Sequence, residues 1–187
     1  MQEVGKETYK EYLARVITKE IGEVVNQKME ETKKELLAIQ YNLTLQQTEE
    51  ILKNYKKLKE HIELSDIDKK TMIGEIKECY DKDIENLMSE VFANNELYLE
   101  GLLKNRYKTI IFLKFIDNIL DKYLKEKKDD KIEIRKKKIL KDLYMQGKKQ
   151  AEFIYNNYEV ERTFYMDREK LIKDLAPYFF GIRGLNI

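Results

Sequence analysis

Residues 148 to 173 hold a set of basic and hydroxyl side chains whose chemistry suits recognition of DNA. Arg162 carries a planar guanidinium that can donate two hydrogen bonds to guanine, and Thr163 and Tyr165 can donate to a phosphate or a base edge. Lysines farther along the chain are better suited to phosphates, because an ammonium group acts there as a point charge. The candidate DNA-binding residues are Lys148, Lys149, Arg162, Thr163, Tyr165, Arg168, Lys170 and Lys173.

The elements that would position these side chains are a short polar helix, a tight turn at 156–159 and a second helix near Glu161. This order predicts a helix-turn-helix within 148–182, and in that motif the second helix lies in the major groove. We expect Val160, Phe164, Leu171, Ile172 and Leu175 to face the core, and Arg162, Thr163, Met166, Glu169, Lys170 and Lys173 to face outward. Acidic side chains are expected on the same face, namely Glu159, Glu161, Asp167 and Glu169.

The distribution of charge also points to the C-terminal half. Residues 1–100 contain 15 Lys plus Arg against 22 Asp plus Glu, a net charge of −7, and residues 101–187 contain 21 against 13, a net charge of +8. Residues 131–174 contain 12 basic and 8 acidic side chains, a net charge of +4. The run Arg135–Lys138 either neutralises phosphates or forms a solvated helix face, since four consecutive residues point in different directions. Chance clustering on solvated faces is the alternative explanation for the asymmetry.

Enzymatic and metal-binding sites find little support in the residue types present. His61 is the only histidine, so neither a histidine-rich metal site nor a general base beside a nucleophile can be assembled. We expect His61 itself to be a surface side chain. Cys79, the only cysteine, is expected in the core. No glycine-rich phosphate loop or Cys-x-x-Cys pair is present. We therefore expect no enzyme, no metal and no cofactor.

An all-α fold is expected, because the chain has one proline and seven glycines and is rich in Lys, Glu, Leu and Ile. Apolar residues at three- and four-residue steps predict a first helix over 3–40, whose stripe should pack on another helix of the chain or on a second copy, although the pattern fades around 27–34. A break at 42–44 and a capping box of Thr44 and Gln47 predict a second helix to about Ile62. Further helices are expected over 67–93, capped by Ser65 or Asp66, over 96–125, the most apolar, and over 132–146, stopped by Gly147.

The polar run Lys127–Lys131 predicts a linker, and hence a helical bundle or oligomerisation region over 1–130 and a helix-turn-helix domain over 131–187. A lone cysteine indicates a reducing compartment. The first residues lack the basic and apolar pattern of a signal peptide, and no apolar run approaches the ~20 residues that a bilayer needs. We expect a cytoplasmic protein that is neither exported nor membrane-spanning.

From about Leu102 onward the chain resembles phage and prophage regulators of the ArpU type, whose C-terminal part is similar to region 4 of sigma factors. The resemblance covers roughly 85 residues, extends faintly to 48–59, and does not include residues 1–40. It rests on four segments in the same order and spacing: Asn105–Leu120, Ile139–Met145, Arg162–Arg168 and Leu175–Ile182. In this chain Met166 stands where the family usually has an exposed arginine, and Arg168 where it usually has an apolar residue.

The resemblance implies a sequence-specific regulator of late phage genes in a bacterial host, binding double-stranded DNA. The N-terminal helices would then provide homodimerisation or a contact with RNA polymerase. The alternative hypothesis is a non-enzymatic helical adaptor with a degenerate helix-turn-helix, which Met166 and the acidic residues favour.

Overall fold

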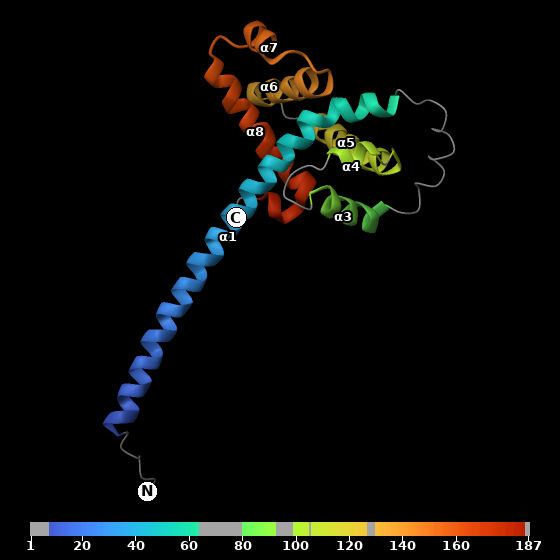
Figure 1. The fold of residues 1–187 in the computed structure, drawn as a ribbon. Helices are drawn as coiled ribbons and strands as arrows, with labels where there is room; N and C mark the ends of the chain where they lie inside the picture. Colours follow the sequence, from blue (N-terminus) through green and yellow to red (C-terminus); the bar gives the residue numbers. More distant parts are fainter. Residues whose placement is uncertain (1–7, 64–79, 93–98, 105, 127–129, 186–187) are drawn as a thin grey trace. The chain divides into compact units, whose positions relative to one another are not determined.

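The computed structural model describes residues 8–63, 80–92, 99–104, 106–126 and 130–185 (Figure 1). Every regular element in these ranges is a helix, so the chain is all-α, as the sequence predicted. The helices are α1 (Tyr9–Glu63), α3 (Tyr80–Val91), α4 (Leu99–Lys104), α5 (Arg106–Lys125), α6 (Lys131–Ile139), the π-helix η2 (Leu140–Met145), α7 (Gln150–Asn157), α8 (Glu161–Phe180) and the 3-10 turn η3 (Gly181–Gly184). None of them combines the length and the apolar character that crossing a membrane requires.

The described residues form two compact units, divided between Gln40 and Tyr41. The N-terminal unit consists of residues 8–40 of α1, and the C-terminal unit contains residues 41–63 of α1 and all other described elements. Residues on both sides of 130 therefore belong to the same unit, whereas the sequence predicted a domain boundary there. The physical reason is a shared core, because Leu120 of α5, Ile139 of α6 and Leu171 of α8 are all buried in one apolar cluster.

The predicted break at 42–44 is wrong, because α1 continues through it without interruption. Thr44 is not an N-cap. Its hydroxyl donates a hydrogen bond to the carbonyl oxygen of Tyr41 at 2.7 Å and lies 3.3 Å from the carbonyl oxygen of Arg183. Its side chain is 3% exposed, and Gln47 and Thr48 beside it are also buried. A threonine that bonds back to its own helix satisfies its hydroxyl without ending the helix.

The core of the C-terminal unit is built around α5, as the sequence predicted. Phe112, Ile116, Leu120 and Tyr123 of this helix are buried. They belong to the same apolar cluster as side chains of α1, α3, α6, η2 and α8, among them Ile51, Leu52, Leu58, Leu87, Ile139, Leu140, Phe164, Leu171 and Leu175. A helix with a broad apolar face is stable only when neighbouring helices cover that face.

The expected helix over 132–146 is observed as α6 followed by η2. Asp130 caps its start, where the carboxylate accepts a hydrogen bond from the backbone N–H of Ile132 at 3.4 Å. Gly147 follows its end with φ of 68°, a conformation that glycine adopts readily. The predictions for Ser65, Asp66, Cys79 and Lys127–Asp129 concern residues outside the described ranges.

Candidate functional site on α7 and α8

α7 and α8 are joined by the short segment Tyr158–Val160 and pack against each other through aromatic rings. Phe164 is fully buried in the second turn of α8. Its ring centroid lies 6.1 Å from that of Phe153 on α7 and 5.5 Å from that of Tyr158, both in edge-to-face geometry. Edge-to-face aromatic pairs have preferred geometries, so these contacts define how the two helices meet.

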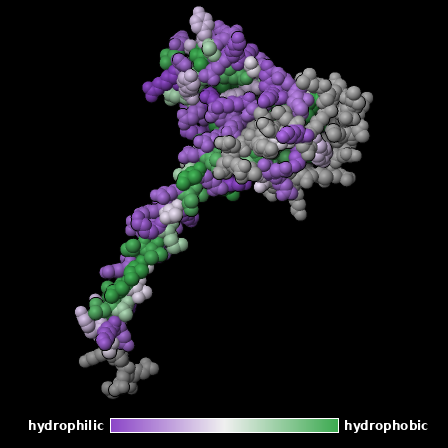
Figure 2. Space-filling view, in the orientation of Figure 1, coloured by the Kyte–Doolittle hydropathy of each residue, from purple (hydrophilic) through white to green (hydrophobic). Residues whose placement is uncertain are grey.

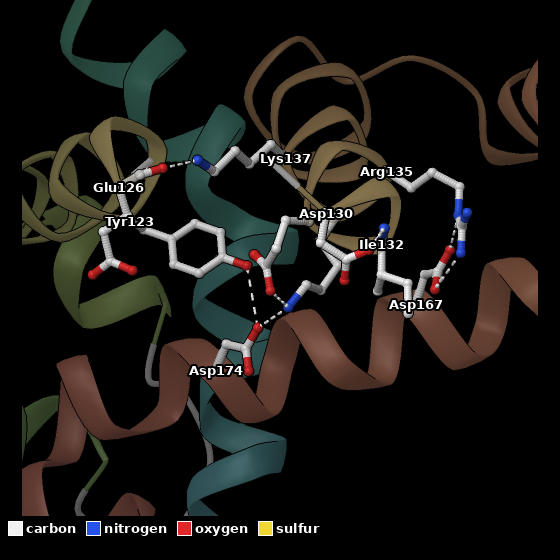
Figure 3. Close-up of polar contacts among 10 residues, drawn as sticks. Tyr123, Glu126, Asp130, Ile132, Arg135, Lys137, Asp167 and Asp174 are labelled. Carbon is white, nitrogen blue, oxygen red and sulfur yellow. Dashed lines mark hydrogen bonds and ion pairs between the residues drawn. The ribbon is translucent and has the colours of Figure 1, made fainter. Parts of the chain in front are cut away.

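Asp167 is a buried carboxylate that links α8 to α6 (Figure 3). The Nε of Arg135 donates to its Oδ2 at 2.5 Å, and the Nη2 of Arg135 lies 3.3 Å from its Oδ1. The hydroxyl of Tyr158 donates to Oδ2 at 3.3 Å. Burial, together with the charge of Asp167, raises the pKa of Tyr158, and the hydrogen bond to Asp167 raises the pKa of Arg135.

The expectation that Asp167 adds negative charge to the outer face of α8 is therefore wrong. Its side chain is 2% exposed, and its charge is balanced by Arg135. A signal for this burial exists in the sequence: Phe164, Asp167, Leu171 and Leu175 follow one another at steps of three and four residues. Asp167 thus lies on the buried stripe of α8 rather than on its outer face.

Arg135, Lys136 and Lys137 form neither a phosphate-binding run nor a solvated face, because each has an internal partner. Lys136 is buried and forms ion pairs with Glu133, at 2.5 Å, and with Asp174 of α8. Burial opposes its charge, but the hydrogen bonds to these carboxylates outweigh burial and raise the pKa of Lys136. The Nζ of Lys137 donates to the carbonyl oxygen of Glu126. Lys138 is exposed.

Arg168 does not extend into solvent, as a DNA-contacting residue would, but links α8 to η2 and to residues 41–63 of α1. Its Nε donates to the hydroxyl of Tyr144 at 2.8 Å, and its Nη2 forms an ion pair with Glu49. Glu49 also pairs with Lys53 at 2.6 Å. Burial opposes the charges of Arg168 and Glu49, but their partners outweigh it, so the pKa of Arg168 is raised and that of Glu49 is lowered.

Four of the other candidate cations are exposed at the start of α7 or on the outer side of α8. Lys148 pairs with Asp142 at 3.2 Å, and Lys173 pairs with Glu169 one turn earlier at 2.5 Å. Arg162 and Lys170 are exposed and form no ion pair with any residue of the described part of the chain. Arg162 and Lys170 are therefore available to an external anion.

The remaining candidates lie beside them. Lys149 is the exposed residue that precedes α7. Thr163 is partly buried, and the exposed Tyr165 donates a hydrogen bond to Glu161 at 2.9 Å. Phe164, Leu171, Ile172 and Leu175 are buried as predicted, but Val160 is 57% exposed. Val160 is the N-cap of α8 with an extended backbone, so its side chain does not join the apolar stripe of the helix.

A metal site is not found within the described ranges, where no three His, Cys, Asp or Glu side chains are grouped to hold an ion. No protein-family model matches the chain, and no curated protein or solved structure is significantly similar to it.

Proposed function

We propose that the chain binds double-stranded DNA through a helix-turn-helix formed by α7, residues 158–160 and α8. The observation that carries this proposal is the position of Arg162. It lies in the first turn of the second helix, is exposed and forms no ion pair with any residue that the structure describes; this is where the motif places residues that contact base edges. The fork of an arginine matches the O6 and N7 acceptors of guanine.

The charges around Arg162 support an anionic partner. Asp167 is buried against Arg135, Glu169 is paired with Lys173, and Glu161 accepts a hydrogen bond from Tyr165. Three of the four acidic groups expected on this face are therefore already bonded, and the fourth, Glu159, is exposed; Arg162, Lys170 and Lys149 have no ion-pair partner among the described residues. Available cations beside carboxylates that are in part paired with other cations favour the binding of phosphates.

The biological role we propose is regulation of transcription, in line with the resemblance to ArpU-type regulators of late phage genes, in the cytoplasm of a bacterial host. One copy with modest positive charge would bind weakly, and two linked copies would bind more tightly through their effective concentration. Homodimerisation through the N-terminal part of α1 is therefore part of this proposal, and RNA polymerase is the expected further partner of the N-terminal region.

The experiment is selection from a pool of random duplex DNA over a range of salt concentrations, followed by sequencing. We expect salt-sensitive retention and an enriched motif, and two spaced copies of the motif for a dimer. Arg162→Ala should lower affinity for the enriched sequence by about tenfold or more, since a bidentate contact to guanine contributes about 1–3 kcal/mol of discrimination. Arg183→Ala, which removes an exposed arginine from η3, is the matched control and should retain the wild-type affinity.

The second candidate function is a helical adaptor that binds another protein through the same face. It is favoured by the exposure of three larger apolar or aromatic side chains there, since Val160, Tyr165 and Met166 are between 45% and 57% exposed. Exposed apolar residues in one place are typical of protein-binding sites. Absence of any DNA retention at low salt would favour the adaptor, and binding lost in Arg162→Ala but kept in Arg183→Ala would favour the regulator.

A further inference from the structure

The N-terminal unit presents an exposed apolar stripe, visible as the hydrophobic side chains along the N-terminal part of α1 in Figure 2. A shallow groove runs along this surface and is lined by Val25, Met29, Thr32 and Leu36, with Lys28 and Lys33 at its edges. Val25, Met29 and Leu36 are between 49% and 64% exposed. Most of the stability of a helix in a protein comes from packing of its apolar face, so we expect this stripe to pack against another apolar surface.

The spacing of the stripe fits a coiled coil between Gly22 and Ile39. The residues Gly22, Val25, Met29, Thr32, Leu36 and Ile39 follow one another at alternating steps of three and four. This alternation is the a and d pattern of a heptad repeat, and it spans about 27 Å of helix. Lys28 and Glu35 precede two of the a residues and flank one side of the seam, and Lys33 flanks the other side.

We infer that this segment pairs in antiparallel orientation with the same segment of a second copy of the chain; this rests on the dimer in the proposed function. The orientation follows from charge. In a parallel pair, the side of the seam that carries Lys28 in one copy faces the other side of the seam in the second copy. This places Lys28 beside Lys33 of the second copy. In an antiparallel pair, the same side of the seam faces itself in the two copies. This places Lys28 of each copy beside Glu35 of the other, so that the contact forms twice.

The sizes of the seam residues agree with the antiparallel register. It places Gly22 opposite Ile39, Val25 opposite Leu36 and Met29 opposite Thr32 of the second copy. Apart from the adjoining backbone of α1, no atom of the described residues lies within 4 Å of the position that a Cβ of Gly22 would take, so there is open space for a large residue of the partner. Glycine is unfavourable inside a helix. At position 22 the absence of a side chain lets Ile39 of the second copy approach closely, which explains the glycine there.

Lys28 is free to make the new contact. Its Nζ pairs with Glu31 at 2.7 Å, but both side chains are largely exposed, and exposed pairs of this kind exchange partners at little cost. Glu35 forms no ion pair within the described ranges. Pairing of Lys28 with Glu35 of the second copy therefore breaks no buried interaction.

Cysteine cross-linking of the full chain tests the orientation. Val25→Cys and Leu36→Cys are made separately in a Cys79→Ser background, mixed in a glutathione buffer and examined by intact mass spectrometry. The mixed 25–36 disulfide should exceed either homodisulfide by about tenfold, because identical positions would be about 16 Å apart, beyond the ~7 Å limit for Cα atoms. Glu23→Cys, on the opposite face, is the control that should not cross-link. Dominant homodisulfides, or a monomer in sedimentation, would overturn the inference.

Charge reversal gives a second test by sedimentation. Lys28→Glu should weaken the dimer by about tenfold, because it faces Glu35 twice, and Lys28→Glu with Glu35→Lys should restore it. Lys34→Glu, on the opposite face, makes the same charge change and should have little effect. A stronger dimer for Lys28→Glu would indicate parallel pairing and contradict the inference.

These outcomes separate the pairing from DNA binding. An antiparallel dimer that retains no duplex DNA would leave the pairing in place and refute the DNA-binding proposal. A monomer that retains duplex DNA would refute the pairing and leave the DNA-binding proposal in place.

Discussion

Arg135 and Asp167 lie 32 positions apart in the chain and form a two-point contact, with Nε 2.5 Å from Oδ2 and Nη2 3.3 Å from Oδ1. The contact joins α6 to the first half of α8, the helix that carries Arg162. A two-point arginine–carboxylate contact restricts both distance and orientation. Arg135 is therefore a positioning residue for α8 rather than a ligand for phosphate.

Asp167→Asn should lower the free energy of unfolding by about 2 kcal/mol, because it leaves a guanidinium without its carboxylate and weakens the contact with Tyr158. Denaturation in urea, followed by circular dichroism, measures the change. Glu169→Gln removes a carboxylate from the exposed side of the same helix and should change the free energy by less than about 0.5 kcal/mol. Equal effects of the two substitutions would show that Asp167 has no special structural role.

Arg168→Met should lower the free energy of unfolding by about 1–2 kcal/mol, because Tyr144 and Glu49 lose a charged hydrogen-bond partner. Lys170→Met, two residues along the same helix, should change it by less than about 0.5 kcal/mol, since Lys170 is exposed. The same urea titration measures both. If only Lys170→Met were destabilising, the assignment of the inner and outer sides of α8 would be wrong.

The pair of Glu49 and Arg168 predicts a dependence of stability on pH. The pKa of Glu49 in the folded chain lies below its ordinary value of 4.5, because Lys53 and Arg168 outweigh the effect of burial. A carboxyl with a lowered pKa contributes stability above the pKa of the unfolded chain and loses it as the pH falls through the folded value. The difference in unfolding free energy between the wild type and Glu49→Gln should therefore be constant near neutral pH and shrink below about pH 4.5. A difference that grows on acidification would contradict this.

Phe164→Ala should lower the free energy of unfolding by about 3–5 kcal/mol, because it leaves a cavity among the rings of Phe153, Tyr158 and Tyr165. Tyr165→Ala, at the neighbouring exposed position, should cost much less. Thermal unfolding followed by circular dichroism compares the two. Similar costs would mean that Phe164 does not anchor α8.

If the chain binds DNA, Lys170→Ala should reduce the slope of log affinity against log salt concentration by about 0.9, the value for one lost phosphate contact. Lys57→Ala removes an exposed lysine of α1 and should leave the slope unchanged. The slopes come from titrations of the enriched duplex at several salt concentrations. An unchanged slope for Lys170→Ala would place this lysine outside the interface.

The helix content, the apolar face of α5 and the helix pair at 150–180 could be predicted from the sequence, because periodic apolar residues and local stop signals encode them. Gly147 and the buried positions Phe164, Leu171 and Leu175 are confirmed examples. The predicted break at 42–44 is wrong, because the hydroxyl of Thr44 bonds back to Tyr41 within α1 instead of capping a new helix. Whether its hydroxyl bonds forward or back depends on the residues packed around it, which local sequence does not reveal.

The contacts of Arg168, Arg135 and Lys136 with carboxylates of other helices could not be predicted, because Glu49, Asp167 and Asp174 are distant from them in the chain. Glu49 and Arg168 are separated by 119 positions, and only the tertiary fold brings them together. Charged residues on a helix look the same in a sequence whether they face solvent or a carboxylate of another helix. The burial of Asp167 was different, since its spacing from Phe164 and Leu171 already placed it on the inner stripe.

Gly184 lies so close to α8 that a Cβ on it would come within 2.4 Å of the carbonyl group of Ala176. Such a clash with backbone cannot be relieved by rotation of a side chain, so every substitution at 184 has to displace the segment that follows α8. If the chain binds DNA through Arg162, a genetic screen for loss of function should therefore return mutations at Gly184 beside those at Arg162. They would act on folding and cellular abundance, and measuring the amount of protein for each mutant would separate the two groups.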